Sequence, residues 1–300
     1  MIVRFLDYVE LKTKITSTFA FLLTIAFLLY RNETIDWDLT GLFFVSMFLF
    51  DLATTAINNY IDTKTNHQKL QFDRKVAYTI IMILLAVSTL SGLYLAWLTG
   101  LVVFLVGGLC FLCGVFYTYG PVPISRMPLG EVLSGVFYGL LIPFLLLYIN
   151  QPEGSILTMQ VNREAFSLEI LLSPALTVLL LSIVPTCATA NIMLANNICD
   201  VEKDILVKRH TLPYYLGDRA LPLFAWIYYS TYPAVILMVV LSLLSPLCLL
   251  YLLTLPLIRR NVKLFCAKQE KATTFIISIQ NYLILMVTLT GLIFCSSLLN

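Results

Sequence analysis

Two polar stretches of this 300-residue chain repeat one pattern of amides and acids. Residues 58–66 read NNYIDTKTN and residues 196–204 read NNICDVEKD, so each has asparagine first, aspartate fifth, and asparagine or aspartate ninth. Positions four apart lie on one face of a helix. Because carboxylate and amide oxygens are the ligands that Mg²⁺ prefers, we expect these two faces to hold metal. The candidate ligands are Asn58, Asp62, Asn66, Asp200 and Asp204.

Acids at these positions need a positive counterpart. Each stretch follows an apolar run, so its carboxylates lie near the C-terminal end of a helix, where the helix dipole favours cations. Charged groups close to a bilayer are also costly. Two such faces opposite one another would hold two Mg²⁺ ions, and a pair of ions would bind a diphosphate rather than fill a cage made only of protein ligands.

Basic residues near the two stretches are candidates for binding the diphosphate. Lys208 and Arg209 follow the second stretch within ILVKRHTLPYYLG, Lys64 lies in the first stretch, and Arg126 lies in the loop between the two. The planar guanidinium of arginine suits phosphate oxygens. The alternative is that these residues only fix the orientation of the loops in the membrane.

The third informative stretch is FYTYGPVPISRMPLGEVLSGVFYG, residues 116–139. Tyr117 begins a stiff turn rich in aromatic residues and proline, and the face of its ring could stabilise a developing cation. The alternative is a belt of aromatic residues at the membrane interface.

The composition shows which elements must position these residues. Hydrophobic residues make up 59% of the chain, charged residues 12%, and the mean hydropathy is +0.89. Soluble proteins have about 25% charged residues, so the composition indicates an integral membrane protein. The net charge of +2 gives no indication of binding to nucleic acid.

A membrane helix needs roughly 20 apolar residues, and the chain offers nine such segments. They centre on Leu23, Phe48, Leu85, Gly108, Leu140, Leu180, Tyr232, Leu250 and Leu285. With the N-terminus in the cytoplasm, all lysines and arginines except Arg31 and Arg163 fall in cytoplasmic loops. This orientation, which fits a bacterial cytoplasmic membrane, also brings both motif loops to the cytoplasmic side.

The predicted fold class is therefore all-α. We expect a polytopic membrane protein with about nine transmembrane helices around a central cavity open to the cytoplasmic side. Residues 1–300 form one domain in this interpretation. The repeated motif divides it into two pseudo-repeated halves, roughly 1–125 and 126–300.

These motifs resemble those of UbiA-type intramembrane aromatic prenyltransferases, whose motifs are N-D-x-x-D-x-x-x-D and D-x-x-x-D. The likeness is greatest to the 1,4-dihydroxy-2-naphthoate prenyltransferases of menaquinone synthesis, which have N-N-x-x-D-x-x-x-D, then G-K-x-T-L and L-G. A stretch Y-T-x-G-P-x-P…L-G-E of that subgroup matches residues 117–123 and 129–131. The second motif matches at Asn196, Asn197, Asp200, Asp204, Thr211, Leu212, Leu216 and Gly217.

The resemblance implies Mg²⁺-dependent transfer of a polyprenyl group from its diphosphate to 1,4-dihydroxy-2-naphthoate, with the isoprenoid tail reaching membrane lipid. Asp62, Asp200 and Asp204 would hold the metal with Asn58, and Tyr117 would shield the allylic cation. Three positions depart from the family: Asn59 and Asn66 replace aspartates, and Lys208 replaces glycine. Asp51 or Asp73 could supply the charge that the first motif lacks.

Two other functions compete with this interpretation. A prenyltransferase of the same family could use another acceptor, such as 4-hydroxybenzoate, homogentisate or haem. A secondary transporter is the alternative from a different class, because acids within membranes often mark ion paths. Transporters, however, bind near the middle of the bilayer, whereas the acids here lie at one membrane face.

Overall fold

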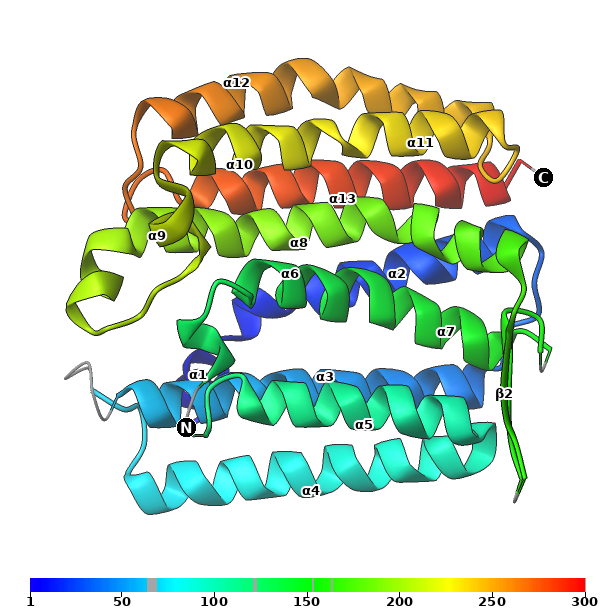
Figure 1. Cartoon of the computed structure of the whole chain (residues 1–300), viewed down its shortest axis with the longest axis horizontal. Helices are drawn as coiled ribbons and strands as arrows, with labels where there is room; N and C mark the ends of the chain where they lie inside the picture. Colours follow the sequence, from blue (N-terminus) through cyan, green and yellow to red (C-terminus); the bar gives the residue numbers. More distant parts are fainter. Residues whose placement is uncertain (64–68, 121–122, 153, 163, 300) are drawn as a thin grey trace. The chain divides into compact units, whose positions relative to one another are not determined.

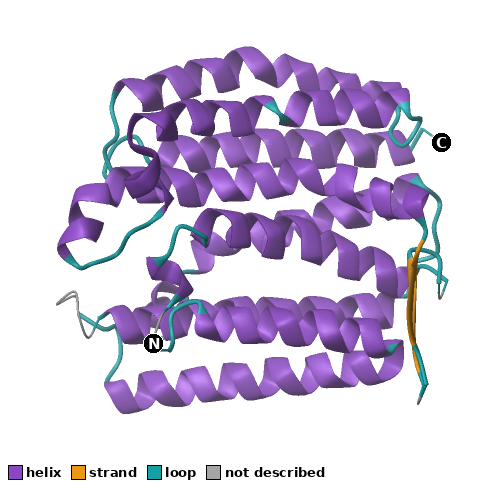
Figure 2. Ribbon diagram, in the orientation of Figure 1, coloured by secondary structure: helices purple, strands orange, loops and turns teal. Residues whose placement is uncertain are grey.

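The computed structural model describes residues 1–63, 69–120, 123–152, 154–162 and 164–299. Helices dominate the described chain (Figures 1 and 2). They divide into two compact units, the first formed by residues 1–18 and 35–124 and the second by residues 19–34 and 125–300. The two units are not two consecutive halves of the sequence, because the helix α2 (Ile15–Tyr30) begins in the first unit and continues in the second.

The first unit is built on three long helices, preceded by a short N-terminal segment. Asp36 begins the first of them, because its carboxylate accepts hydrogen bonds from the backbone N–H groups of Asp38 and Leu39, at 3.1 and 3.0 Å. The described elements of this unit are α1 (Ile2–Tyr8), η1 (Leu11–Lys14), α3 (Trp37–Asp62), α4 (Arg74–Thr99) and α5 (Leu101–Phe116).

Helices α4 and α5 are joined by a single residue. Gly100 has a φ of +93°, which glycine adopts at little cost and other residues rarely adopt. The short break WLTG therefore does separate two helices, as the hydropathy predicts. In the core of the unit, α3 packs along α4 through small residues such as Ala53, Ala56 and Ala77.

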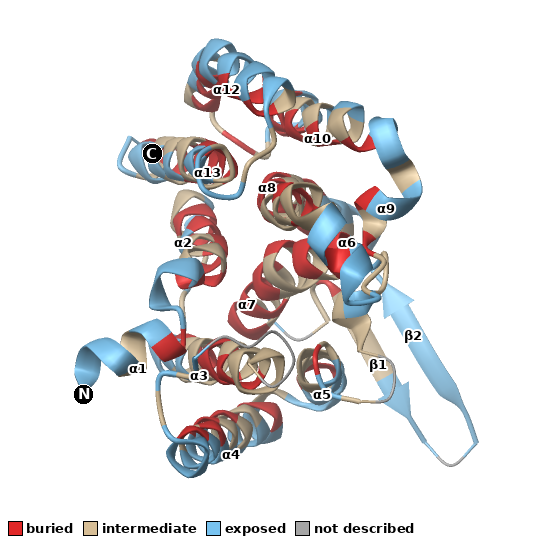
Figure 3. Cartoon of the chain, turned by 90° about the vertical axis from the view of Figure 1, so that its left-hand side faces the viewer, coloured by how far each residue is buried: buried red, intermediate tan, exposed pale blue. Residues whose placement is uncertain are grey.

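The second unit is organised around α8 (Leu172–Leu206). Helices α10 (Ala220–Tyr229), α11 (Thr231–Val240) and α13 (Ile276–Ser297) pack against it, and much of its surface is buried (Figure 3). The remaining elements are η2 (Ile124–Arg126), α6 (Gly130–Ser134), η3 (Gly135–Leu141), α7 (Ile142–Asn150), β1 (Leu157–Val161), β2 (Phe166–Ile170), α9 (Leu212–Leu216), η4 (Gly217–Arg219), η5 (Pro246–Thr254) and α12 (Leu255–Ala267).

A close helix crossing positions α6 beside the end of α8 that carries the second motif. The segment η3 is a π-helical turn that presents Gly135 and Gly139 to α8. A Cβ atom on Gly139 would lie 2.2 Å from the backbone nitrogen of Thr186, so only glycine fits this contact. Pro185 lies at the same level of α8 and lacks the N–H group that a regular helix would use.

Eight helices of the described chain are long and apolar enough to cross a membrane. They contain eight of the nine predicted span centres, so the predicted all-α class of membrane protein is confirmed. The ninth predicted segment, around Leu250, is also helical and comprises η5 and α12, but Arg259, Arg260 and Lys263 shorten its apolar part. The loop after α7 contains a small antiparallel hairpin in which Leu157 pairs with Ile170.

Candidate active site

The second motif occupies the last turns of α8 and contacts a lysine far away in the sequence. Asp200 Oδ2 lies 2.7 Å from Nζ of Lys271, which lies in the turn between α12 and α13. The same ammonium group also donates a hydrogen bond to Oδ1 of Asn196. Both contacts lie on the helix face predicted to bind metal, so this face already holds a cation.

Asp204 lies one turn further along α8 and is buried. Arg209 folds back over it, with Nη1 of the guanidinium 3.7 Å from Asp204 Oδ1 and its backbone N–H donating to the Asp204 carbonyl at 2.9 Å. The Nε of Arg209 donates to the Ser125 carbonyl at 2.9 Å. Arg209 is thus held beside the motif by its backbone and its side chain.

A buried polar network supports Arg209 from the side of α6. The Nδ2 of Asn197 donates to Oε1 of Glu131 at 2.8 Å, and its Oδ1 accepts from Nη2 of Arg209 at 3.4 Å. Glu131 and Asn197 are only 3% and 1% exposed. A buried carboxylate is costly unless it is hydrogen-bonded, so this contact couples the fold of α6 to the geometry of the motif.

In the first unit, the described part of the first motif meets the aromatic turn. Asn58 Oδ1 accepts a hydrogen bond from Oγ1 of Thr118 at 3.0 Å, and Thr118 directly follows Tyr117. Asp62 is the last residue of α3 and is partly buried. The structure thus brings the region of Tyr117 to the end of α3. The predicted ligand Asn66 and the predicted diphosphate contact Lys64 lie outside the described residues.

The paired asparagines of the two motifs share part of one hydrogen-bond pattern. The first asparagine of each pair is an acceptor, Asn58 for Thr118 and Asn196 for Lys271. The second is a donor: Asn59 Nδ2 donates to the Tyr8 carbonyl at 2.9 Å and to Oε1 of Glu10 at 3.1 Å, much as Asn197 donates to Glu131. An ionised aspartate could make none of these donations. Asn59 is therefore suited to its local partners.

Asp51 has a structural role in the first unit. Its Oδ1 lies 2.8 Å from Nζ of Lys14, and its Oδ2 accepts from the Ser17 hydroxyl at 2.7 Å. Lys14 and Asp51 are both buried, so they form an internal ion pair. The suggestion that Asp51 supplies the missing charge of the first motif is therefore wrong, because its carboxylate neutralises Lys14.

Two further predicted residues lie at the surface. Lys208 is exposed and has a φ of +57°, a left-handed conformation, two residues after α8 ends at Leu206. Arg126 has an exposed side chain, and its carbonyl accepts a hydrogen bond from the backbone N–H of His210 at 3.2 Å. That bond ties the loop after α8 to the segment before α6.

The oxygen donors of the second motif fit a magnesium ion that also binds a substrate. In the part of the chain that the structure describes, no three His, Cys, Asp or Glu residues converge to form a closed metal cage. Mg²⁺ commonly keeps several waters and binds one or two carboxylates together with phosphate oxygens. Asp200 and Asp204 supply such carboxylates, and Lys271 marks a point near Asp200 that attracts a cation.

The sequence motifs do not predict the contact of Lys271 with Asp200 or the hydrogen bond between Glu131 and Asn197. Lys271 lies 71 residues from Asp200 and belongs to a turn with no motif of its own. The signals for Glu131 were its place in the L-G-E triplet and its being, with Arg126, one of the two charges in residues 116–139.

The fold and the site together define a polytopic membrane protein with a polar, cation-attracting cluster at the end of a central helix. Residues 19–284 match the UbiA prenyltransferase family, and the chain belongs to this family. The resemblance seen in the motifs is thereby confirmed.

Individual relatives agree with this assignment. The chain is 28% identical over 182 residues to 1,4-dihydroxy-2-naphthoate octaprenyltransferase of Bacillus subtilis (strain 168); the match covers 59% of this chain and about half, 52%, of that protein. A structure of digeranylgeranylglyceryl phosphate synthase has a TM-score of 0.64 at 14% identity, over 98% of this chain and 99% of that one. A UbiA homologue from Archaeoglobus fulgidus bound to GPP and Mg²⁺ has a TM-score of 0.60 at 13% identity, over 98% and 99%.

Proposed function

We propose that this protein transfers a polyprenyl group from an allylic diphosphate to 1,4-dihydroxy-2-naphthoate, with release of carbon dioxide and diphosphate, to give the quinol form of demethylmenaquinone. The observation that carries the proposal is the acidic face of α8, where Asp200 and Asp204 lie between Lys271 and Arg209. The name of the Bacillus subtilis relative supports the choice of acceptor. The N-N-x-x-D-x-x-x-D form of the second motif is a further reason to prefer this acceptor to others.

Magnesium is the metal that we propose for this site, as in the Archaeoglobus fulgidus homologue bound to GPP and Mg²⁺. Asp200 and Asp204 of the second motif, and Asn58, Asp62 and Asn66 of the first, are the proposed ligands. When bound, Mg²⁺ would neutralise the charge of the diphosphate as it leaves. The chain's own residues then bind, orient and shield the reacting groups.

Arg209 is the residue that we propose to bind the diphosphate. Its guanidinium is fixed by Ser125 and Asn197, so little conformational entropy is lost when it meets phosphate oxygens. Its positive charge would stabilise the charge that develops on the leaving group as the allylic C–O bond breaks. Lys64, Lys208 and Arg126 are proposed as outer contacts of the same diphosphate.

Tyr117 is the proposed shield for the allylic cation. The hydrogen bond from Thr118 to Asn58 holds this turn at the end of α3, close in sequence to the metal ligands of the first motif. The π-face of a tyrosine attracts a cation, and a shielded cation is captured by the ring of the acceptor rather than by water. The attacked ring carbon then loses carbon dioxide and regains aromaticity.

The protein is an integral membrane protein, and we propose that its N-terminus and both motif loops face the cytoplasm of a bacterial cell. A central cavity that opens to that side would admit the charged diphosphate and the aromatic acid from water. The isoprenoid tail would lie between helices in contact with lipid. A site in the membrane suits the reaction, since the donor tail and the product are both apolar.

The test is an assay of the purified protein in detergent with 1,4-dihydroxy-2-naphthoate and a long allylic diphosphate. We expect a prenylated product, lighter by carbon dioxide than the simple adduct, with Mg²⁺ and none with EDTA. Product formed only with 4-hydroxybenzoate, homogentisate or haem would assign a different acceptor. Uptake of substrate into vesicles without a covalent product would instead indicate a transporter.

A further inference from the structure

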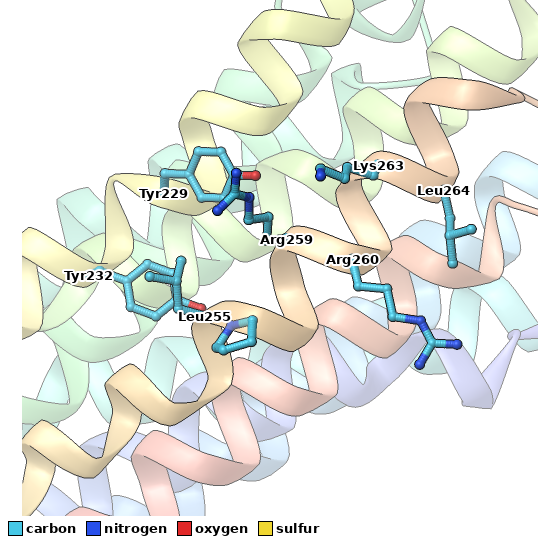
Figure 4. A pocket seen from close by; sticks show the side chains of 8 residues that line it. Tyr229, Tyr232, Leu255, Arg259, Arg260, Lys263 and Leu264 are labelled. Atoms are coloured by element: carbon cyan, nitrogen blue, oxygen red, sulfur yellow. The ribbon is translucent and has the colours of Figure 1, made fainter.

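A groove outside the motif region runs along one face of the second unit (Figure 4). It lies between the end of α10 and start of α11 on one side and the junction of η5 with α12 on the other. Its volume is about 1260 Å³. The lining residues are Tyr229, Tyr232, Leu255, Pro256, Arg259, Arg260, Lys263 and Leu264.

Three positive charges gather at this groove without partners. Arg259, Arg260 and Lys263 are all exposed, and none forms an ion pair with any residue that the structure describes. Arg259 and Lys263 lie one helical turn apart on the side of α12 that faces Tyr229. The next basic residues along the chain differ, because Lys268 pairs with Glu270 at 2.9 Å and Lys271 pairs with Asp200.

The walls of the groove combine an apolar surface with one available hydroxyl group. Tyr232 is buried and its hydroxyl is hydrogen-bonded to Oγ1 of Thr254 at 2.9 Å, so it forms a fixed wall. The hydroxyl of Tyr229 makes no hydrogen bond to a described residue and remains free to donate. Two exposed leucines, Leu255 and Leu264, line the groove beside the basic residues. Leu250, Leu253 and Leu257 are also exposed and belong to the same helical segment, η5 and α12.

We propose that this groove binds the headgroup phosphate of an anionic phospholipid, with the acyl chains lying along the exposed leucines. Basic pockets between membrane helices bind anionic headgroups, and arginine forks suit phosphate oxygens. A free phosphate would find the same charges, but it would leave the adjoining apolar surface without an occupant. The lipid site goes beyond the proposed prenyl transfer and does not depend on it.

The experiment is native mass spectrometry of the full chain in detergent during titration with phosphatidylglycerol or phosphatidylcholine. Both lipids carry a phosphate, but only phosphatidylglycerol has a net negative charge. We expect phosphatidylglycerol to bind about tenfold more tightly, and R259Q/R260Q/K263Q to lose this preference. The matched control R4Q/K12Q/K75Q removes the same amount of positive charge from exposed positions in the first unit. This control should keep the preference for phosphatidylglycerol.

Several outcomes would overturn the lipid site. A preference for phosphatidylglycerol that persists in R259Q/R260Q/K263Q would show that these three residues do not bind the headgroup. An equal loss of the preference in the control variant would indicate attraction to net charge alone. Displacement of the lipid by millimolar inorganic phosphate would assign the groove to a soluble anion. If the triple variant does not fold, R259K/R260K tests the same point, because it keeps the charge and should keep at least half of the preference.

Discussion

The ammonium group of Lys271 lies 2.7 Å from the carboxylate of Asp200 and also contacts the amide oxygen of Asn196. A lysine from the turn before α13 thus occupies the helix face where the motif is expected to bind metal. Metal binding to Asp200 must displace this ammonium group or share the carboxylate with it. Lys271 would then be free to meet the diphosphate.

Lys271→Ala should strengthen metal binding in the absence of substrate. Lys271 is 39% exposed, so the ion pair is worth at most about 1 kcal/mol, which corresponds to a change of two- to fivefold in affinity. Binding of Mn²⁺, followed by electron paramagnetic resonance, measures the effect directly. Lys268→Ala is the control, because Lys268 pairs with Glu270 outside the motif. Unchanged Mn²⁺ affinity in Lys271→Ala would show that the lysine does not compete.

Asp200→Ala and Asp204→Ala should each reduce turnover at least about a hundredfold, because each removes a metal-binding carboxylate at a site that stabilises the leaving diphosphate. The protein should still reach the membrane and elute as a single species. Glu202→Gln serves as the control, since Glu202 is exposed on the same helix and lies between the two aspartates. Full activity in both alanine variants would contradict the metal assignment.

Asn197→Asp should destabilise the protein more than Asn59→Asp. A carboxylate at position 197 would lie beside the buried Glu131 and lose the donated hydrogen bond, at a cost of roughly 3 kcal/mol. At position 59 the neighbouring Glu10 is exposed, so we expect a loss of about 1 kcal/mol. Thermal unfolding in detergent compares the two variants. Equal stability losses would show that the burial of Glu131 is not decisive.

Gly139→Ala should disrupt the crossing of η3 with α8. The added methyl group would overlap backbone atoms of Thr186, which cannot move without displacing the helix, and overpacking of this kind costs about 1–3 kcal/mol or more. Gly291→Ala in α13 is the matched control, because its added Cβ would have no atom within 4 Å apart from the adjacent backbone of its own helix, and it should be neutral or stabilising. The melting temperature distinguishes the two. Similar behaviour of both variants would contradict the close crossing.

Lys208→Gly should raise stability by up to about 1 kcal/mol, because glycine adopts the φ of +57° at position 208 without steric cost.

The same variant tests the proposed phosphate contact. Lys208 is exposed, so its loss should raise the apparent KM for the prenyl diphosphate less than Arg209→Ala does. A larger effect at Lys208 than at Arg209 would reverse the assigned roles.

Local features of the site follow from neighbouring residues in the sequence, and these were predictable. The spacing of Asn196, Asp200 and Asp204 places them on one face of a helix because the helical repeat is a property of consecutive residues. The lengths of the apolar runs predict the membrane helices, because a helix needs a fixed number of consecutive apolar residues to cross a bilayer. Lys208 stands where the family has glycine, and the structure shows a left-handed conformation there.

Contacts between distant segments were decided by the tertiary structure. Lys271 meets Asp200, Glu131 meets Asn197, and Lys14 neutralises Asp51 although no spacing in the sequence links these pairs. Each contact depends on how helices cross, and the crossing depends on packing such as the fit of Gly139 against α8. The sequence by itself determined which residues could do the chemistry. Only the packed helices decided which charges neutralise one another, because Coulomb energies depend on distance and burial rather than on order along the chain.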